Sequence, residues 1–173
     1  MSVRAVIGFG SNLGDGRQLV VSAWSRLAAQ DKVIPIQLSS LYASEAVGMV
    51  SRYSFTNAVG MVETDYSPTE LLHLLLAIEE EHGRRRDEDA IVYQDRSLDL
   101  DLLYFGETVT STAELTLPHP HIAARLFVLA PLAEIAPDLQ DPQTGLTVRE
   151  MARQLVVRIE RGIVPPQPIL RIE

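Results

Sequence analysis

The chain has 173 residues, of which 46% are hydrophobic and 22% are charged, and this favours one compact domain over a disordered chain. Its net charge of −8 argues against a general nucleic-acid-binding protein, which would usually be basic. The absence of cysteine excludes a disulfide framework, a thiolate metal site and a cysteine nucleophile, and it fits the cytoplasm, where we expect the protein to act.

The first part of the chain alternates apolar segments with turn signals. Glycine-rich residues 10–15 follow the first apolar run and predict a turn before a helix. Residues 43–54, which contain Gly48, predict a loop. The β-branched and apolar runs predict strands, and apolar residues at helical spacing predict the helix. The expected elements are strands at Val3–Phe9, Val33–Tyr42 and Phe55–Glu63, and a helix at about Asp15–Ala29.

The next helix has the clearest boundaries. Ser67-Pro68-Thr69-Glu70 is a capping box with proline at the first helical position, and Gly83 is a stop signal. The apolar stretch 71–78 inside it is much shorter than the roughly 20 residues that span a bilayer, so we expect no membrane association. The polar segment 84–95 then predicts an exposed loop that could close over a substrate.

Downstream, Leu98–Phe105 alternates as a strand does, short helices are expected within 118–137, and another helix at Thr147–Leu155. The resulting β-α-β-β-α-β order predicts an α+β, ferredoxin-like antiparallel sheet with additional C-terminal helices. We expect one domain over residues 1–155 and an extended tail over 156–173, where three prolines occur. Many chemistries use this fold, so function must come from the site.

The sharpest chemical signal is Asp99-Leu100-Asp101 within the fourth predicted strand. Alternate residues of a strand share a face, so both carboxylates point one way, with their backbones roughly 7 Å apart. A hard divalent cation would relieve their repulsion, and magnesium commonly takes one or two carboxylates plus substrate phosphates. An isolated Asp-x-Asp is more often an ordinary polar strand face.

Arginines surround this pair. Arg84, Arg85 and Arg86 form a run, Arg96 precedes the aspartates and Arg125 follows. Guanidinium groups match phosphate oxygens in a bidentate manner, although the run could also be a solvated loop beside its acidic neighbours. Cations next to paired carboxylates are what phosphoryl transfer requires.

Other residues could bind a ligand. Phe55 and Asn57 share a strand face and could stack on a flat heterocycle and hydrogen-bond its edge, or simply fill a core. Glu79 could accept hydrogen bonds from a ligand or an arginine, or be solvated surface. His119 and His121 lack a convincing third metal ligand, so a phosphate contact by His119 is more economical.

Several of these segments together resemble the 6-hydroxymethyl-7,8-dihydropterin pyrophosphokinase family, over about residues 3–155. The most specific segment is Arg96-Ser97-Leu98-Asp99-Leu100-Asp101. The flanking matches are Gly8–Asp15, Phe55-Thr56-Asn57-Ala58, Glu79 through Gly83-Arg84, Leu117-Pro118-His119, Arg125, Phe127 and Pro131-Leu132. The resemblance implies diphosphate transfer from ATP to the hydroxymethyl group of the pterin, with release of AMP, in folate biosynthesis.

The resemblance also implies roles for individual residues. Asp99 and Asp101 would hold two Mg²⁺ ions that bridge the ATP phosphates, and Arg84 and Arg96 would act on the diphosphate in flight. The residues implied for ATP are Glu79, Arg86, Leu102, His119 and Arg125. Those implied for the pterin are Ser44, Val47, Phe55, Asn57, Tyr93 and Phe127. The partners are small molecules only, no general base is assigned, and we expect a monomer.

Two departures from the family pattern keep alternatives open. Tyr93-Gln94-Asp95 stands where the family usually has Trp-Gly-Pro or similar, and Glu45-Ala46-Val47 stands where prolines are frequent. The altered pterin loop leaves room for a related phospho- or nucleotidyltransferase with another hydroxyl acceptor. A non-catalytic nucleotide-binding module is the third possibility, although such a module would be expected to lack one of the two aspartates.

Overall fold

A computed structural model describes residues 1–45, 54–83 and 97–172 of the chain. The strands of the main sheet are β1 (Val3–Ser11), β2 (Val33–Leu38), β3 (Leu41–Ser44), β4 (Phe55–Thr64), β5 (Asp99–Phe105) and β8 (Ile169–Ile172). A small hairpin contains β6 (Thr110–Ser111) and β7 (Thr116–Leu117). The helices are α1 (Gly16–Ala28), α2 (Pro68–Glu81), the 3₁₀ turn η1 (Ile122–Ala124), α3 (Leu126–Ile135) and α4 (Val148–Glu160).

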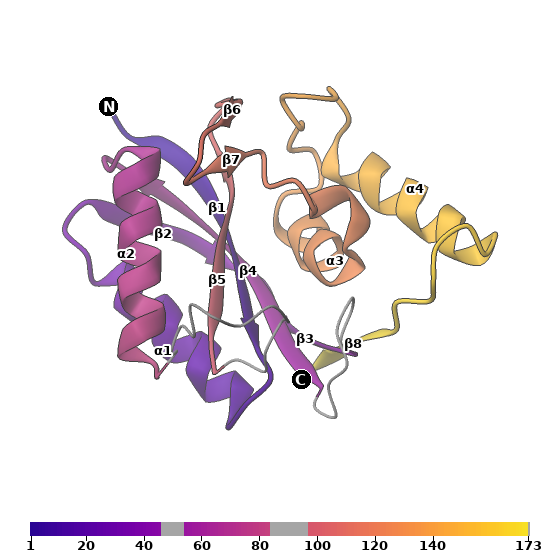
Figure 1. Cartoon of the computed structure of the whole chain (residues 1–173), viewed down its shortest axis with the longest axis horizontal. Helices are drawn as coiled ribbons and strands as arrows, with labels where there is room; N and C mark the ends of the chain where they lie inside the picture. Colours follow the sequence, from indigo (N-terminus) through magenta and orange to yellow (C-terminus); the bar gives the residue numbers. More distant parts are fainter. Residues whose placement is uncertain (46–53, 84–96, 173) are drawn as a thin grey trace.

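The main sheet is antiparallel at each of its pairings, with strand order β5-β1-β4-β3-β8, and β2 also pairs with β4 (Figure 1). This arrangement confirms the expected ferredoxin-like α+β fold. Because β1 and β4 are central, residues of β5 at one edge and of β3 near the other are linked through only two intervening strands. The sheet can therefore hold side chains from distant parts of the sequence in one row.

The helix signals in the sequence form the expected caps. The Ser67 side chain accepts a hydrogen bond from the Glu70 backbone, and the Glu70 side chain accepts one from the Ser67 N–H. Gly83, just after α2, has a φ of +87°, which a residue with a side chain adopts only with strain. A second capping box at Thr147 and Glu150 begins α4. None of the helices in the described part of the chain is long and apolar enough to cross a membrane.

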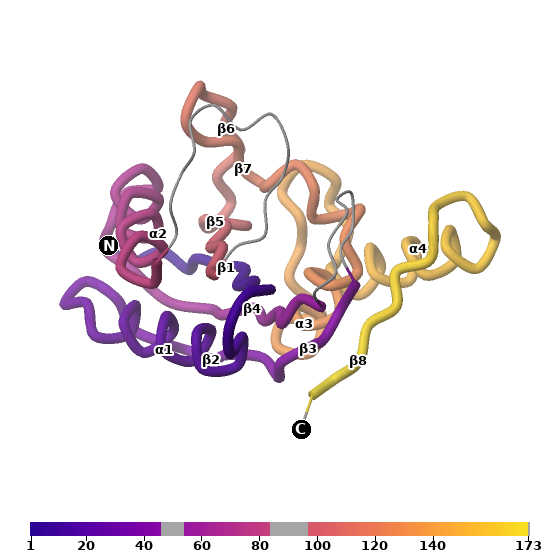
Figure 2. Tube along the Cα trace, turned by 60° about the horizontal axis from the view of Figure 1, so that its bottom comes forward, coloured from indigo at the N-terminus to yellow at the C-terminus, as the bar shows by residue number. Residues whose placement is uncertain are grey.

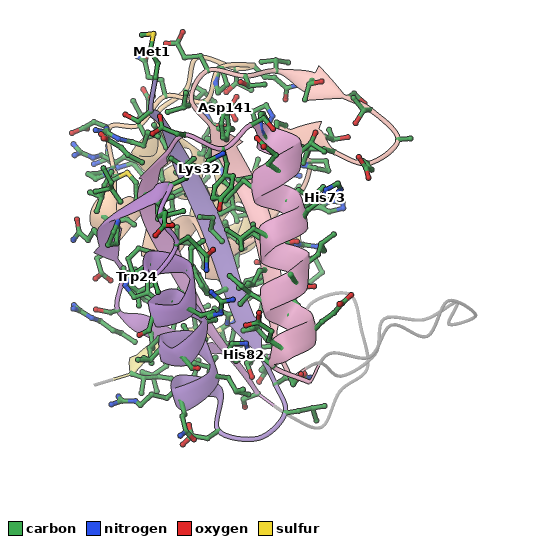
Figure 3. All side chains as sticks on the ribbon, turned by 90° about the vertical axis from the view of Figure 1, so that its left-hand side faces the viewer. Met1, Trp24, Lys32, His73, His82 and Asp141 are labelled. Carbon is green, nitrogen blue, oxygen red and sulfur yellow. The ribbon has the colours of Figure 1, made fainter. Side chains whose placement is uncertain are left out.

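The two faces of the sheet pack against different helices. One core contains Ala5, Ile7 and Phe9 of β1 together with buried residues of α1 and α2, and Figure 3 shows these two helices side by side over the sheet. The other core contains Val6 of β1 and buried residues of α3 and α4. The alternation along β1 thus divides the molecule into a three-layer arrangement in which the α3 face also carries the polar residues described below.

Two segments differ from the expectation. The single strand predicted over Val33–Tyr42 is two strands, β2 and β3, which pair with opposite ends of the long strand β4. Ser39 lies between β2 and β3, and its hydroxyl accepts a hydrogen bond from the Val59 N–H at 3.0 Å. At the C-terminus α4 continues to Glu160, so the expected boundary at residue 155 falls inside a helix, and the expected extended tail includes β8, a strand of the main sheet.

Candidate active site

Asp99 and Asp101 lie on β5 with their side chains on the α3 face of the sheet. They alternate with Leu98, Leu100 and Leu102, which are at most 2% exposed in the core beneath α1 and α2. Both aspartates are half-buried. Across the sheet they pair with glycines of β1, Asp99 with Gly10 and Asp101 with Gly8. The carboxylates therefore border a stretch of sheet on which no β1 side chain stands.

We call the stretch of sheet formed by Gly8 and Gly10 the glycine floor. Asn57 lies on the opposite side of this floor from the aspartates, because Gly10 pairs with Asn57 of β4 as well as with Asp99. Asn57 is only 3% exposed. Its amide nitrogen donates to the Ser44 hydroxyl at 2.8 Å and to the Tyr42 carbonyl at 3.3 Å. Its Oδ1 faces Gly10, where an added Cβ would lie 3.6 Å away. The amide is thus fixed by β3 with its acceptor directed toward the floor.

Phe55 and Ser44 extend this polar row. They pair with each other between β4 and β3, and two-residue alternation places Phe55 on the same face as Asn57. Ser44 is buried at 6% exposure, whereas Phe55 is half-buried. The structure therefore brings together Ser44, Phe55 and Asn57, three of the four described residues that the family resemblance implies for the pterin; the fourth is Phe127.

His119 contacts Asp101 from the segment that follows β7. Its backbone N–H donates to the Leu103 carbonyl at 2.9 Å, which holds the ring beside β5. The ring Nδ1 accepts from the His121 N–H at 3.2 Å, so the neutral ring carries its proton on Nε2, the atom 3.8 Å from Asp101 Oδ1. Burial, with help from the charge of Arg125, lowers the pKa of His119 to about 4. At neutral pH the contact is therefore polar rather than a salt bridge.

Arg125 approaches the same carboxylate from the residue that precedes α3. Its Nη1 lies 3.8 Å from Asp101 Oδ2, with the two side chains 23% and 35% exposed. Its guanidinium carbon is 5.7 Å from the ring centroid of Phe127, within range of a cation–π contact. A cation therefore stands beside Asp101 with an aromatic ring within reach of it, and the ATP role expected of Arg125 and the pterin role expected of Phe127 remain predictions.

Glu79 of α2 contacts β5, the strand that carries the two aspartates. It lies on α2, is 1% exposed, and its Oε1 accepts a hydrogen bond from the Leu100 N–H at 2.7 Å. Leu100 separates the two aspartates on β5, the edge strand of the sheet. A buried carboxylate thus fixes the backbone between Asp99 and Asp101, a contact that the surface-or-ligand alternatives drawn from the sequence did not include.

Not every predicted site residue joins this cluster. The Leu102 side chain, at 2% exposure, packs into the core on the opposite face of the sheet from Asp101, so only its backbone could line a ligand. Val47, Arg84, Arg86, Tyr93 and Arg96 lie outside the described residues. Their predicted roles remain predictions.

The glycine-rich turn after β1 has a structural explanation. Asp15 is the N-cap of α1, and its Oδ1 accepts from the Gln18 N–H at 3.1 Å. Gly14 has a φ of +71°. The turn lines a cavity of about 350 Å³ together with Ser54 and Thr56, at the start of α1. Because a carboxylate already occupies the helix N-terminus, this turn does not present it to a phosphate.

Sequence reasoning missed two contributors. The first is the pairing of Gly8 and Gly10 with the aspartates, which was not predicted from the sequence. The period-two pattern of Val3–Phe9 could have placed these glycines on one face. The second is the C-terminal segment, where β8 pairs with β3 so that Ile169 is opposite Ser44. Nothing in the local sequence of that segment indicates this pairing.

The donor set fits a cation shared with a phosphate ligand. Within residues 1–45, 54–83 and 97–172, no group of three or more His, Cys, Asp or Glu side chains is placed to hold a metal ion. Magnesium does not need such a group, because it keeps several waters and binds through one or two carboxylates plus substrate phosphates. Asp99 and Asp101 supply oxygen ligands of that kind.

Comparison with known proteins points to one family. The model of the 7,8-dihydro-6-hydroxymethylpterin-pyrophosphokinase (HPPK) family matches residues 6–137. A 2-amino-4-hydroxy-6-hydroxymethyldihydropteridine pyrophosphokinase of Synechocystis sp. is 40% identical over 151 residues, covering 87% of this chain and 75% of the relative. One from Pseudomonas aeruginosa is 39% identical over 142 residues, covering 82% of this chain and 86% of the relative.

Solved structures agree on the fold. The Plasmodium falciparum HPPK-DHPS wild type with pteroate superimposes with a TM-score of 0.74 over 94% of this chain, at 14% sequence identity. An HPPK-DHPS in complex with substrates gives a TM-score of 0.71 over 93% of this chain. The chain spans 44% and 45% of the lengths of those two proteins, respectively.

Proposed function

The chain belongs to the 7,8-dihydro-6-hydroxymethylpterin-pyrophosphokinase family of diphosphate-transferring enzymes of folate biosynthesis, and we propose that it uses ATP to diphosphorylate 6-hydroxymethyl-7,8-dihydropterin and releases AMP. The observation that carries the site assignment is the row Asp99–Gly10–Asn57 across β5, β1 and β4. At one end of this row are carboxylates that can bind the cations of a phosphate complex. At the other end is an amide that can hydrogen-bond to the edge of a heterocycle. The glycine between them leaves room for the two substrates to meet.

The nucleotide side of this proposal lies around Asp101. Asp99 and Asp101 would hold two Mg²⁺ ions, which when bound supply charge neutralisation to the phosphate oxygens. Arg125 and the Nε2–H of His119 stand beside Asp101 and can each donate to a phosphate oxygen. The neutral state of His119 lets it donate without adding a second positive charge beside Arg125.

The outer edge of β5 completes the nucleotide side. The Leu100 N–H on this edge is taken by Glu79, and two-residue periodicity gives the Leu102 N–H the same direction. We therefore assign the nucleotide contact of Leu102 to its backbone, and we assign Glu79 to the support of the strand as well as to the nucleotide. Arg84, Arg86 and Arg96 are assigned to the phosphates from the family resemblance alone.

The pterin side lies over Asn57. Its Oδ1 can accept from the N–H groups of a pterin edge, since its amide nitrogen already donates to Ser44 and Tyr42. Phe55 shares a face of β4 with Asn57, and we assign it and Phe127 of α3 to stack on the two ring faces. Val47 and Tyr93 belong to the pterin site by the family resemblance only.

The reaction joins these two sides. The pterin hydroxyl oxygen forms a bond to the β-phosphorus of ATP, the bond between the β-phosphorus and the oxygen bridging to the α-phosphorus breaks, and AMP leaves with that oxygen. The hydroxyl proton is lost to solvent or to a phosphate oxygen, and no protein base is assigned. Such a transfer depends chiefly on positioning and on stabilisation of phosphate charge, which is what the described residues can provide.

Substitution of the two aspartates tests the proposal. Asp99→Asn and Asp101→Asn should each lower the rate of AMP formation by about a thousandfold or more, because a single electrostatic contact to a transferring group contributes about 10²–10³ and a phosphate-bound cation would be lost with it. AMP is measured with ATP, magnesium and 6-hydroxymethyl-7,8-dihydropterin all present. Asp31→Asn, at an exposed position, is the matched control.

The product distinguishes the alternatives. AMP that forms only when the pterin is present supports the proposal, whereas ADP would indicate an ordinary kinase. AMP formation with another hydroxyl acceptor but not with the pterin would indicate the related transferase. Tight ATP binding with no turnover would indicate the non-catalytic module. A near-wild-type rate in either aspartate variant would contradict the metal assignment.

We also propose that the enzyme acts as a monomer in the cytoplasm on these two small molecules. The proposal draws on the family resemblance and on the lack of cysteine, which suits a reducing compartment. Light scattering after size-exclusion chromatography measures the mass directly. A mass near 19.1 kDa would support the monomer, and one near twice that value would contradict it.

A further inference from the structure

The chain after α4 runs back to the main sheet, where it ends beside β3 (Figure 2). It ends in β8, which pairs with β3 so that Tyr42 is opposite Arg171 and Ser44 is opposite Ile169. The family model match stops at residue 137, well before this segment. The segment therefore contacts elements of the candidate active site from a part of the chain that the family pattern does not describe.

Gln167 makes the most specific of these contacts. Its Oε1 accepts from the Leu126 N–H at 2.8 Å and its Nε2 donates to the Ala124 carbonyl at 2.9 Å. These two backbone groups flank Arg125. A carboxamide presents one acceptor and one donor side by side, so a single side chain satisfies the peptide groups on both sides of one residue.

The backbone at Arg125 is a place where such support is needed. Arg125 is the N-cap residue of α3, with an extended backbone (φ −121°, ψ 104°), and its own side chain makes no capping hydrogen bond. The first N–H groups of a helix have no partner within the helix. Gln167 supplies the partner for the Leu126 N–H and so fixes the peptide group that follows Arg125, whose Nη1 lies 3.8 Å from Asp101 Oδ2.

Gln167 is itself held by the strand that follows it. Arg171 of β8 donates from Nε to the Ser40 hydroxyl at 2.9 Å and lies 3.9 Å from a carboxylate oxygen of Glu134. Glu134 is on α3 and also accepts from the Ser40 and Tyr42 side chains. The C-terminal segment is therefore held to both β3 and α3. The Gln167 side chain in this segment is half-buried.

We propose that Gln167 is a positioning residue of the nucleotide site, which fixes the backbone of Arg125 so that its guanidinium faces Asp101 and the phosphates of ATP. The inference rests on the proposed function, because it takes Arg125 to be a nucleotide contact. The C-terminal segment thereby contributes to nucleotide binding through the backbone of Arg125.

A double-mutant cycle on nucleotide affinity tests this inference. The probe is α,β-methylene-ATP with magnesium, which cannot be cleaved between the α- and β-phosphorus, and its dissociation constant is measured by titration calorimetry. We expect Gln167→Ala to raise that constant about tenfold, equivalent to about 1.4 kcal/mol, and Arg125→Ala to raise it by at least as much. In the Arg125→Ala background, Gln167→Ala should add less than about twofold, because its effect passes through Arg125.

Two further variants separate positioning from loss of folding. Gln30→Ala removes a glutamine hydrogen bond to a backbone carbonyl in α1, away from the site, and should leave the dissociation constant unchanged. Gln167→Glu keeps an acceptor for the Leu126 N–H but places a carboxylate oxygen against the Ala124 carbonyl, so it should weaken binding as well. Thermal unfolding of each variant shows whether the protein is folded, and if Gln167→Ala is not, the Gln167→Glu cycle replaces it.

The results separate the two proposals. If Arg125→Ala leaves the dissociation constant unchanged, the nucleotide role of Arg125 is wrong and the proposed site fails. If Arg125→Ala weakens binding but Gln167→Ala does not, Gln167 is not a positioning residue. An equal effect of Gln167→Ala with and without Arg125 would also overturn the inference, since Gln167 would then act by another route.

Discussion

Asp99 and Asn57 stand on either side of Gly10, in one row that crosses β5, β1 and β4. The two side chains come from segments 42 positions apart in the sequence, yet two strand spacings, roughly 10 Å, separate their backbones. Gly8 repeats the arrangement next to Asp101. The sheet thus holds the acidic and amide parts of the site at a fixed separation, and glycine keeps the space between them open.

A larger side chain at Gly10 should block that space. An added Cβ meets only Asn57 Oδ1, at 3.6 Å, an ordinary contact. We therefore expect Gly10→Ala to retain most of the activity and Gly10→Val to lower kcat/KM by about a hundredfold or more, because two further methyl groups would project over the floor while valine itself suits a strand. Steady-state kinetics and thermal unfolding measure both effects. Loss of folding with Gly10→Val, or unchanged kinetics, would contradict this view of the floor.

Removal of the Glu79 carboxylate should weaken the strand that bears the aspartates. Glu79→Ala leaves the buried Leu100 N–H without the partner that it has at 2.7 Å, so we expect the free energy of unfolding to fall by about 1–3 kcal/mol. Glu79→Gln retains an acceptor and should cost less. Urea unfolding provides the measurement, and Glu80→Ala on the exposed side of α2 is the control. Equal stability of the Ala and Gln variants would show that the Leu100 contact is unimportant.

Stability should fall between pH 6.5 and pH 4 because of His119. Burial lowers its folded-state pKa to about 4, whereas a histidine in an unfolded chain has a pKa of about 6.5. Between these values the unfolded chain binds a proton that the folded chain does not, so the free energy of unfolding decreases as the pH falls through this window. It does not depend on His119 above the window. The loss attributable to this group is about 3 kcal/mol at most.

A His119→Asn variant isolates that contribution. Urea unfolding of wild type and variant is compared at pH 7.5 and pH 4.5, without nucleotide or magnesium. The carboxylates titrate in both proteins, so the wild type should lose more stability than the variant over this interval. An identical loss in the two proteins would mean that the folded-state pKa of His119 is close to its ordinary value.

Gly60→Ala should destabilise the fold through the opposite face of the sheet. A Cβ at Gly60 would lie 2.6 Å from Trp24 Cζ3 and 3.0 Å from Phe9 Cε2, and Trp24 and Phe9 already form an edge-on ring pair at 6.1 Å. Overpacking of this kind costs about 1–3 kcal/mol, which thermal or urea unfolding would detect. Trp24→Phe in the Gly60→Ala background should recover part of the loss, and failure to do so would place the strain elsewhere.

The local patterns predicted much of the fold and part of the site. The two-residue period of Leu98–Phe105 put Asp99 and Asp101 on one face, as the burial of Leu98, Leu100 and Leu102 shows, and the capping box at Ser67 gave the start of α2. Such features depend only on residues near each other in sequence. The same period put Phe55 and Asn57 on one face of their strand.

Features that depend on pairing over long distances were not accessible in this way. The division of the segment Val33–Tyr42 reflects the length of β4, which accommodates two partners end to end. The prolines at 165, 166 and 168 suggest extended chain but do not specify that β8 pairs with β3. The burial of Glu79 against Leu100 likewise requires α2 to be packed on β5, so three consecutive glutamates gave no means of choosing among them.

The location of β8 affects how the protein should be handled in the laboratory. Ile172 is paired with Leu41 at the border of the sheet, whereas the N-terminus lies at a different corner of the molecule, separate from the C-terminus (Figure 1). A purification tag or fluorescent fusion joined after β8 would disturb the pairing of β8 with β3, which holds the segment that contains Gln167. A tag joined before β1 would not disturb this pairing. The same enzyme tagged at its two ends should therefore differ in its apparent nucleotide affinity.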